Sequence, residues 1–172
     1  MKDIDDKSFE EIVEEYTPLL FNFIAKIAGR DNASDLIQET FIKIWKNLKR
    51  FNPKKASLKT WIFTIARNTA IDFLKKKKSL VFSELEDEEI ENLEEESPLP
   101  DEVFETKENR ELLKNLLEDL PANYKILILL YYEEEMTFEE IAKIMNRPLN
   151  TIKSWKRRAI FELKNSILGG NN

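Results

Sequence analysis

The sequence contains neither cysteine nor histidine, and only three of its 172 residues are glycine. These absences exclude disulfides, thiolate nucleophiles and the usual zinc ligand sets, and they remove the most frequent general base of enzymes. Gly29 and the pair Gly169–Gly170 are too few and too scattered to build a glycine-rich phosphate loop. We therefore expect no catalytic residue, no metal site and no cofactor.

Long apolar runs are missing as well. No stretch of about 18 apolar residues occurs, so we expect no membrane insertion. The N-terminal segment MKDIDDKSFEE is polar and acidic, unlike a signal peptide. We expect the protein to remain in the cytoplasm.

Charged residues, in contrast, are abundant and strongly segregated. They make up 35% of the chain, whose formal net charge is −6. Residues 79–106 contain twelve Asp and Glu and no Lys or Arg, whereas residues 41–78 contain twelve Lys and Arg and one Asp. A second basic stretch, residues 143–164, has seven Lys and Arg against one Glu. A single charged run is usually solvated surface, but two basic runs that each fall on one helix face are harder to explain in that way.

The acidic segment also marks a boundary between domains. It combines its charge with Pro98 and Pro100, and it cannot bury enough apolar surface to offset the entropy of ordering it. We therefore predict an all-α fold with two helical domains, at residues 1–78 and 107–172, joined by an acidic flexible linker at residues 79–106.

The first domain shows helical periodicity. Apolar residues recur at three- and four-residue spacing over residues 9–27, and Gly29 suits the end of this helix. A second helix is predicted from about Ser34 to Arg50. Its apolar stripe comprises Leu36, Ile37, Phe41, Ile44, Trp45 and Leu48.

A third helix is predicted after the break at Asn52-Pro53, with Ser57 as its cap and the lysines of residues 75–78 at its end. Winding it at about 100° per residue gathers four residues beside its apolar face: Trp61, Thr64, Asn68 and Lys75. An aromatic ring, an amide and a cation on one accessible stripe can stack on bases, bond to their edges and attract phosphate. Packing of Trp61 at the edge of the domain explains the stripe equally well.

The second domain ends in the pattern of a helix-turn-helix. A capping box at residues 137–140 opens a short helix, residues 146–148 form a turn, and a last helix, capped by Asn150 or Thr151, extends to about Ile167. The apolar arc of that helix comprises Ile152, Trp155, Ala159 and Leu163. Its opposite, basic arc comprises Lys153, Arg157 and Lys164. A helix anchored on one side and basic on the other can enter a major groove, where Arg pairs bidentately with guanine.

Two motifs of the first domain resemble region 2 of RNA polymerase sigma factors. They are DLIQETFIKIW at residues 35–45 and WIFTIARN at residues 61–68, and the short chain is similar to the extracytoplasmic-function (ECF) group of the sigma-70 family. The resemblance implies that the first motif binds the β′ clamp helices of core RNA polymerase, through Asp35, Gln38 and Glu39. It also implies that the following helix, with the loop before it, opens and reads the −10 promoter element. The residues that it assigns to the non-template strand there are Lys43, Asn52, Lys59, Trp61 and Asn68.

The second domain is similar to region 4 of the same family, from Leu120-Pro121 through TFEEIA at residues 137–142 to TIKSWKRRA at residues 151–159. The resemblance implies that the last helix reads the −35 element in duplex DNA and that the domain touches the polymerase β-flap. It assigns base or phosphate contacts to Lys153, Ser154, Arg157 and Arg158. Trp155 and Lys156 stand where the family commonly has an Arg and an apolar residue, which leaves the −35 preference open.

The resemblance thus implies a sigma factor, not an enzyme, whose partners are core RNA polymerase, promoter DNA and an anti-sigma factor. A stand-alone helix-turn-helix regulator would explain the second domain, but it leaves the motif at residues 35–39 without a role. A helical enzyme that uses the carboxylates of the Glu-rich segment is a weak alternative, because nothing in that segment would shift their pKa values. Binding to core polymerase distinguishes the sigma factor from both.

Overall fold

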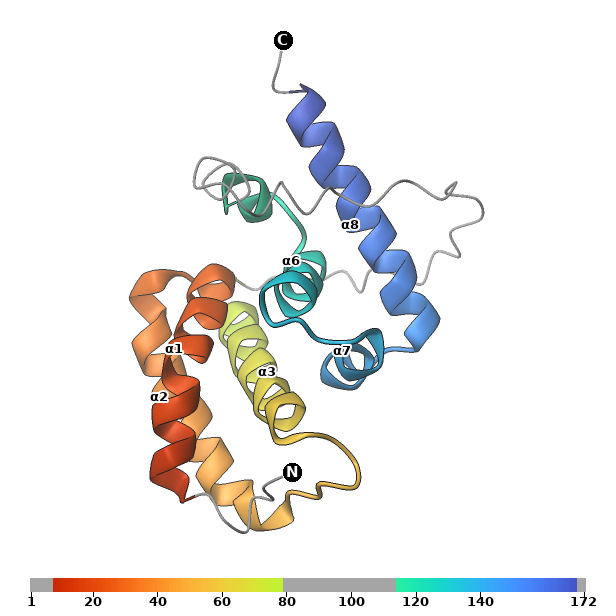
Figure 1. The fold of residues 1–172 in the computed structure, drawn as a ribbon. Helices are drawn as coiled ribbons and strands as arrows, with labels where there is room; N and C mark the ends of the chain where they lie inside the picture. Colours follow the sequence, from red (N-terminus) through yellow and green to blue (C-terminus); the bar gives the residue numbers. More distant parts are fainter. Residues whose placement is uncertain (1–7, 79–113, 170–172) are drawn as a thin grey trace. The chain divides into compact units, whose positions relative to one another are not determined.

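A computed structural model describes residues 8–78 and 114–169, and these residues form helices without any strand (Figure 1). The first part contains α1 (Phe9–Ala28), α2 (Arg30–Asn47), the short 3-10 helix η2 (Leu48–Arg50) and α3 (Leu58–Lys78). The second part contains α6 (Ala122–Ile128), the π-helix η3 (Leu129–Glu133), α7 (Phe138–Met145) and α8 (Leu149–Gly169). The expected all-α fold is confirmed.

These residues divide into two compact units. The first holds α1, α2 and α3, and the division also assigns Glu139–Asn146 to it, whereas the second holds α6, η3 and α8. The domain bounds stay predictions, because the expected acidic linker at residues 79–106 lies outside the described residues. No helix in the described parts has both the length and the apolar character needed to cross a membrane.

The start and end of α1 follow from local hydrogen bonds. Ser8 caps the helix: its hydroxyl accepts a hydrogen bond from the Glu11 backbone N–H at 3.3 Å, and its own N–H donates to the Glu11 carboxylate at 2.8 Å. Gly29 ends the helix with a φ of +91°, which a residue with a side chain adopts only at a cost. Because this one glycine makes the whole turn, α2 begins at Arg30, earlier than the predicted Ser34.

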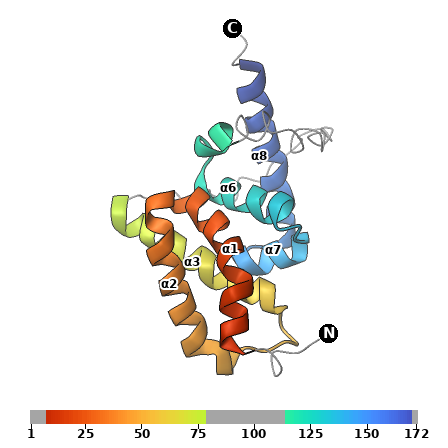
Figure 2. The ribbon, with the colours of Figure 1, turned by 60° about the vertical axis from the view of Figure 1, so that its left-hand side comes forward.

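The three long helices of the first unit pack against one another (Figure 2). Their core consists of fully buried apolar residues, including Ile12, Leu20, Phe23, Ile24, Ile44, Ile62 and Phe63. The rings of Phe23 and Phe63 meet edge to face, with 5.2 Å between their centroids. One prediction for α2 is wrong: Trp45, expected in the apolar stripe, is 61% exposed. It lies on the flank of the helix, where its ring packs against Phe9 at 4.9 Å.

In the second unit, a buried segment supports α8. Residues 126–130 are buried, and α6 packs against α8. After Ile128 the helix continues as a π-helix from Leu129, where the Glu134 N–H donates to the Leu129 carbonyl at 3.2 Å. The wider turn leaves Tyr131 and Tyr132 only half-buried.

The turn before α8 rests on two residues with special backbone roles. Asn146 has a φ of +50°, a conformation that asparagine tolerates well, and its N–H donates to the Lys143 carbonyl at 3.3 Å. Pro148 precedes α8, and its carbonyl accepts a hydrogen bond from Ile152 N–H at 3.2 Å. The helix therefore begins at Leu149, before the predicted caps Asn150 and Thr151, and it ends at Gly169.

Candidate nucleic-acid and polymerase interfaces

The solvent face of α2 carries the three residues predicted to bind polymerase. Asp35, Gln38 and Glu39 are all exposed. Ile42 lies between them on the helical wheel, at 100° per residue, and is 53% exposed. A single exposed apolar side chain is common on protein surfaces, so Ile42 becomes informative only together with the exposed Trp45, one helical turn away. The prediction missed Ile42, although its position on the polar side of the helix could have revealed it.

Trp45 extends this face at its edge. Its ring packs on Phe9, and Phe9 in turn meets Phe41 edge to face at 6.3 Å. The three rings join α1 to α2 and hold the indole in place while leaving most of it in solvent. Together with Ile42, Trp45 adds apolar area beside the predicted polar contacts. We call Asp35, Gln38, Glu39, Ile42 and Trp45 the α2 face.

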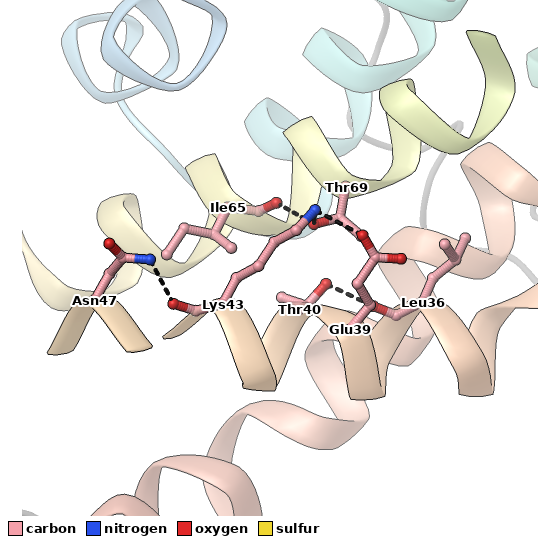
Figure 3. Close-up of polar contacts among 7 residues, drawn as sticks. All are labelled: Leu36, Glu39, Thr40, Lys43, Asn47, Ile65 and Thr69. Carbon is pink, nitrogen blue, oxygen red and sulfur yellow. Dashed lines mark hydrogen bonds and ion pairs between the residues drawn. The ribbon is translucent and has the colours of Figure 1, made fainter. Parts of the chain in front are cut away.

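Lys43 connects α2 to α3 (Figure 3). Its Nζ lies 2.7 Å from Glu39 Oε1 and donates a hydrogen bond to Thr69 Oγ1 at 3.1 Å. The buried Thr69 hydroxyl donates in turn to the Ile65 carbonyl at 2.9 Å. The resemblance assigned Lys43 to DNA and Glu39 to polymerase, and the structure brings the two into one ion pair. Because both side chains are substantially exposed, the ion pair itself is worth only about 0–1 kcal/mol.

Trp61 lies half-buried at the start of α3 and pairs with Phe51, the first residue of the loop between η2 and α3. Their ring centroids are 5.2 Å apart, at an interplanar angle of 57°. The two readings of Trp61, base stacking and packing at the domain edge, both fit this position, because the ring is supported on Phe51 and remains accessible. Phe51 was not predicted as a site residue, and only its aromatic character near the loop could have suggested it.

The other residues predicted at the −10 element are accessible, and each has a local contact. Asn52 Oδ1 accepts a hydrogen bond from the Lys54 N–H at 3.0 Å, which shapes the loop. Asn68 is exposed, and its Oδ1 accepts from Arg67 Nη1 at 3.1 Å. Lys59 is half-buried, with its ammonium 5.8 Å from the ring centroid of Phe63.

On α8 the structure separates an apolar from a basic face as predicted, although Lys164, expected on the basic arc, is half-buried. The apolar arc is buried, and Ile160, which was not predicted, joins it: Ile152, Trp155, Ala159, Ile160 and Leu163. Lys153 and Arg157 are exposed, while Ser154 and Arg158 are half-buried beside them. We call these four residues the α8 basic face.

Trp155 holds α8 to the rest of its unit. Its ring lies 6.1 Å from that of Tyr124 in an edge-to-face arrangement, and the Arg147 guanidinium lies 5.9 Å from its centroid. The expectation that Trp155 belongs to the core side is confirmed.

The described residues offer little for metal chemistry. Within residues 8–78 and 114–169, no three side chains of the types that commonly bind metals come together. What these residues do offer is an exposed basic face on a helix, an aromatic pair beside a loop, and an exposed face of mixed polarity.

Two family models match the chain. Sigma-70 region 2 matches residues 12–80, and sigma-70 region 4 matches residues 110–160. Curated proteins are similar over most of their length. The ECF RNA polymerase sigma factor RpoE of Cereibacter sphaeroides is 30% identical over 161 residues, which cover 93% of this chain and 86% of that protein. The ECF sigma factor SigW of Bacillus subtilis is 29% identical over 157 residues, covering 87% of this chain and 83% of that protein.

Solved structures are similar as well. The sigma factor RpoE of Bartonella quintana, crystallised with the anti-sigma factor NepR, matches with a TM-score of 0.68 and 26% identity, over 95% of this chain and 98% of that one. CnrH, solved with the cytosolic domain of CnrY, matches with a TM-score of 0.66 over 95% of this chain and 89% of that one. At 17% identity, this second likeness shows the fold alone.

Proposed function

Because the chain belongs to the ECF group of sigma-70 family RNA polymerase sigma factors, we propose that its two units divide promoter recognition between them. A sigma factor directs promoter-specific initiation of transcription, and this chain has both sigma regions that such recognition uses. In our proposal α8 reads the −35 element, α3 and the loop before it read the −10 element, and the α2 face binds core polymerase. The observation that carries the proposal is the α8 basic face, whose Lys153 and Arg157 are exposed opposite a buried arc.

At the −35 element, α8 lies in the major groove of duplex DNA. Lys153 and Arg157 are exposed and reach the DNA first, and Arg157 can pair with the O6 and N7 atoms of a guanine. Ser154 and Arg158 flank them and suit contacts to the phosphate backbone, which set the register of the helix without reading sequence.

At the −10 element, the first unit captures bases of the opened strand. Trp61, supported by Phe51, gives a flipped base a ring to stack on, and such stacking is worth about 1–3 kcal/mol per base. Asn52 and Asn68 supply amides for base edges, and Lys59 supplies charge for the backbone. Strand opening is then driven by binding energy, so the protein needs no catalytic step and is not an enzyme.

The α2 face binds the β′ clamp helices of core polymerase. Its polar residues Asp35, Gln38 and Glu39 surround the exposed Ile42, with Trp45 at the edge. Apolar and aromatic anchors within a polar rim are the usual anatomy of a protein interface. The second unit makes a further contact, with the β-flap.

An anti-sigma factor is a further proposed partner. The sigma factor RpoE of Bartonella quintana, which has a similar fold, was crystallised with the anti-sigma factor NepR. An inhibitor that covers the α2 face or the α8 basic face would keep this protein from polymerase or promoter. Because core polymerase works in the cytoplasm, we place the protein there.

The polymerase assignment is tested with Gln38→Ala combined with Glu39→Ala. We expect the double variant to bind core polymerase more weakly, with an unchanged circular dichroism spectrum and melting temperature. Glu14→Ala is the matched control, because Glu14 is an exposed carboxylate on another helix, α1. Glu39→Ala also breaks the ion pair with Lys43. The single variant Gln38→Ala keeps that ion pair, so its affinity for core polymerase measures the contribution of the α2 face alone.

If the double variant bound core polymerase as tightly as the wild type, the α2 face would not be part of the polymerase interface. If the wild-type protein neither bound core polymerase nor directed transcription with it, but still bound duplex DNA, the protein would act as a stand-alone regulator instead.

A further inference from the structure

Lys156 belongs to the basic run of α8, yet its ammonium is surrounded by aromatic rings of its own unit. The Nζ atom lies 3.9 Å from the ring centroid of Tyr131, 5.4 Å from that of Tyr132 and 5.6 Å from that of Phe138. All three distances fall within the range of about 6 Å in which a cation is attracted to the face of a ring. We call Tyr131, Tyr132 and Phe138 the aromatic cage.

The rings of the cage also contact one another. Tyr131 and Phe138 are stacked, with 5.1 Å between centroids and an interplanar angle of 24°. Tyr131 and Tyr132 meet edge to face at 4.9 Å. Because the rings support each other, the cage does not depend on Lys156 alone for its shape.

The backbone around η3 explains how these rings gather. Successive residues of an α-helix point about 100° apart, so two neighbouring tyrosines seldom contact the same atom. Here the helix widens to a π-helix at residues 129–133, and Glu135 then adopts a φ of +54°. The Met136 N–H donates to the Leu130 carbonyl at 3.0 Å, which turns the chain back and brings Phe138 to the tyrosines.

The cage explains why a charged residue is stable at position 156, next to the core. Lys156 is half-buried and follows the buried Trp155 on α8. Its methylene stem can lie along apolar surface while its ammonium meets the rings. A partly desolvated cation–π contact is stronger than an exposed ion pair, so this lysine contributes more to its unit than a solvated one would.

We propose that Lys156 is a positioning residue for promoter recognition: its contacts with the cage fix the rotation of α8 about its own axis. This inference rests on the proposed role of α8 at the −35 element. Lys153 and Arg157 lie three residues before and one residue after Lys156, so any rotation of α8 moves both DNA-facing cations together. The cage therefore acts on DNA affinity through geometry, and Lys156 itself does not contact phosphate.

The experiment compares Lys156→Met, which keeps an unbranched apolar stem without charge, with Lys156→Arg, which keeps a cation. The probe is a DNA duplex that the wild-type protein, in complex with core polymerase, enriches from a pool randomised in the −35 region, and a scrambled duplex is its control. The affinity of each variant, in complex with core polymerase, for the two duplexes is measured over a range of salt concentrations. The temperature is kept well below the melting temperature of each variant.

We expect Lys156→Met to weaken binding of the enriched duplex about 5-fold, which corresponds to roughly 1 kcal/mol. Binding of the scrambled duplex and the dependence of affinity on salt should not change. Lys156→Arg should restore most of the affinity. Tyr131→Leu should cause a similar loss, and adding Lys156→Met to it should cost little more, because both changes remove the same contact.

Three results would overturn the inference. A uniform loss on both duplexes, with a salt slope lower by about one charge, would make Lys156 a phosphate contact. A lower melting temperature with unchanged preference for the enriched duplex would leave it a purely structural role. If the wild-type complex enriched no −35 sequence, the role of α8 would be refuted, and this inference with it. If the wild type preferred the enriched duplex and Lys156→Met kept that preference, only the role of Lys156 would be refuted.

Discussion

α3 and α8 are each 21 residues long and each belongs to a basic stretch of the chain, but they use their polar side chains differently. Around α3, the proposed site residues are engaged within the protein: Lys43 with Glu39 and Thr69, and Trp61 with Phe51. The exposed lysines of residues 75–77 gather at its C-terminal end, where cations interact favourably with the helix dipole. On α8, Lys153 and Arg157 project into solvent opposite the buried arc.

The difference corresponds to the two forms of DNA that we assign to these helices. Unstacked bases of a single strand must be captured one by one, so their site needs rings and amides held in place. A duplex presents a regular groove lined by phosphates, so an exposed cationic face on a rigid helix is sufficient. On α8, therefore, the internal contacts orient the whole helix, whereas around α3 they orient individual side chains.

The largest expected effect is a loss of stability when the packing of α3 against α1 is disrupted. Phe63→Ala removes a fully buried ring that meets Phe23, and it should lower the free energy of unfolding by about 3–5 kcal/mol, measured by urea denaturation. Ile42→Ala is the control, because an exposed side chain should change stability by about 0.5 kcal/mol or less. Equal losses for the two variants would contradict the packing of α3 described above.

An intermediate effect is expected on the α8 basic face. Arg157→Ala should weaken binding to the −35 element by about 1–3 kcal/mol if its guanidinium reads a base, with no loss of stability. The measurement compares affinities for promoter duplexes that differ at single −35 positions. A loss that is equal for all of these duplexes would reassign Arg157 to a phosphate.

The smallest effect is expected at the link between α2 and α3. Lys43→Met removes the contacts to Glu39 and Thr69, and it should lower the free energy of unfolding by about 0.5–1.5 kcal/mol. Lys46→Met, a change of the same kind at an exposed position of α2, should leave stability unchanged. If both variants were as stable as the wild type, Lys43 would contribute no more to stability than Lys46, and the contrast between the two helices would be lost.

Much of the fold could be predicted because helical periodicity is a local property. The spacing of apolar residues identified the buried arcs of α1 and α8, and Gly29 marked the end of α1. The prediction failed where a side chain lies at the boundary between core and solvent. Trp45 is apolar and roughly in phase with the stripe of α2, but it lies at the flank of the packed face, where Phe9 of α1 covers only part of its ring.

The assignments to DNA and polymerase came from motifs, and the structure adds contacts that motifs do not contain. The residues between Asp35 and Trp45 identified the face of α2, yet nothing in their order indicated that Lys43 would bond to Thr69, 26 residues later. Phe51 was overlooked as a partner of Trp61 for the same reason, since a loop of unknown path separates the two rings.

By itself, the sequence determined that this protein is helical, that its basic stretches are separated by an acidic one, and which face of each long helix is apolar. These properties depend on residues within a few turns of one another, so periodicity and charge reveal them. Only the tertiary structure decided that Lys43 joins two helices and that Lys156 enters an aromatic cage. The reason is that each ammonium meets groups from other elements, which chain folding alone brings within reach.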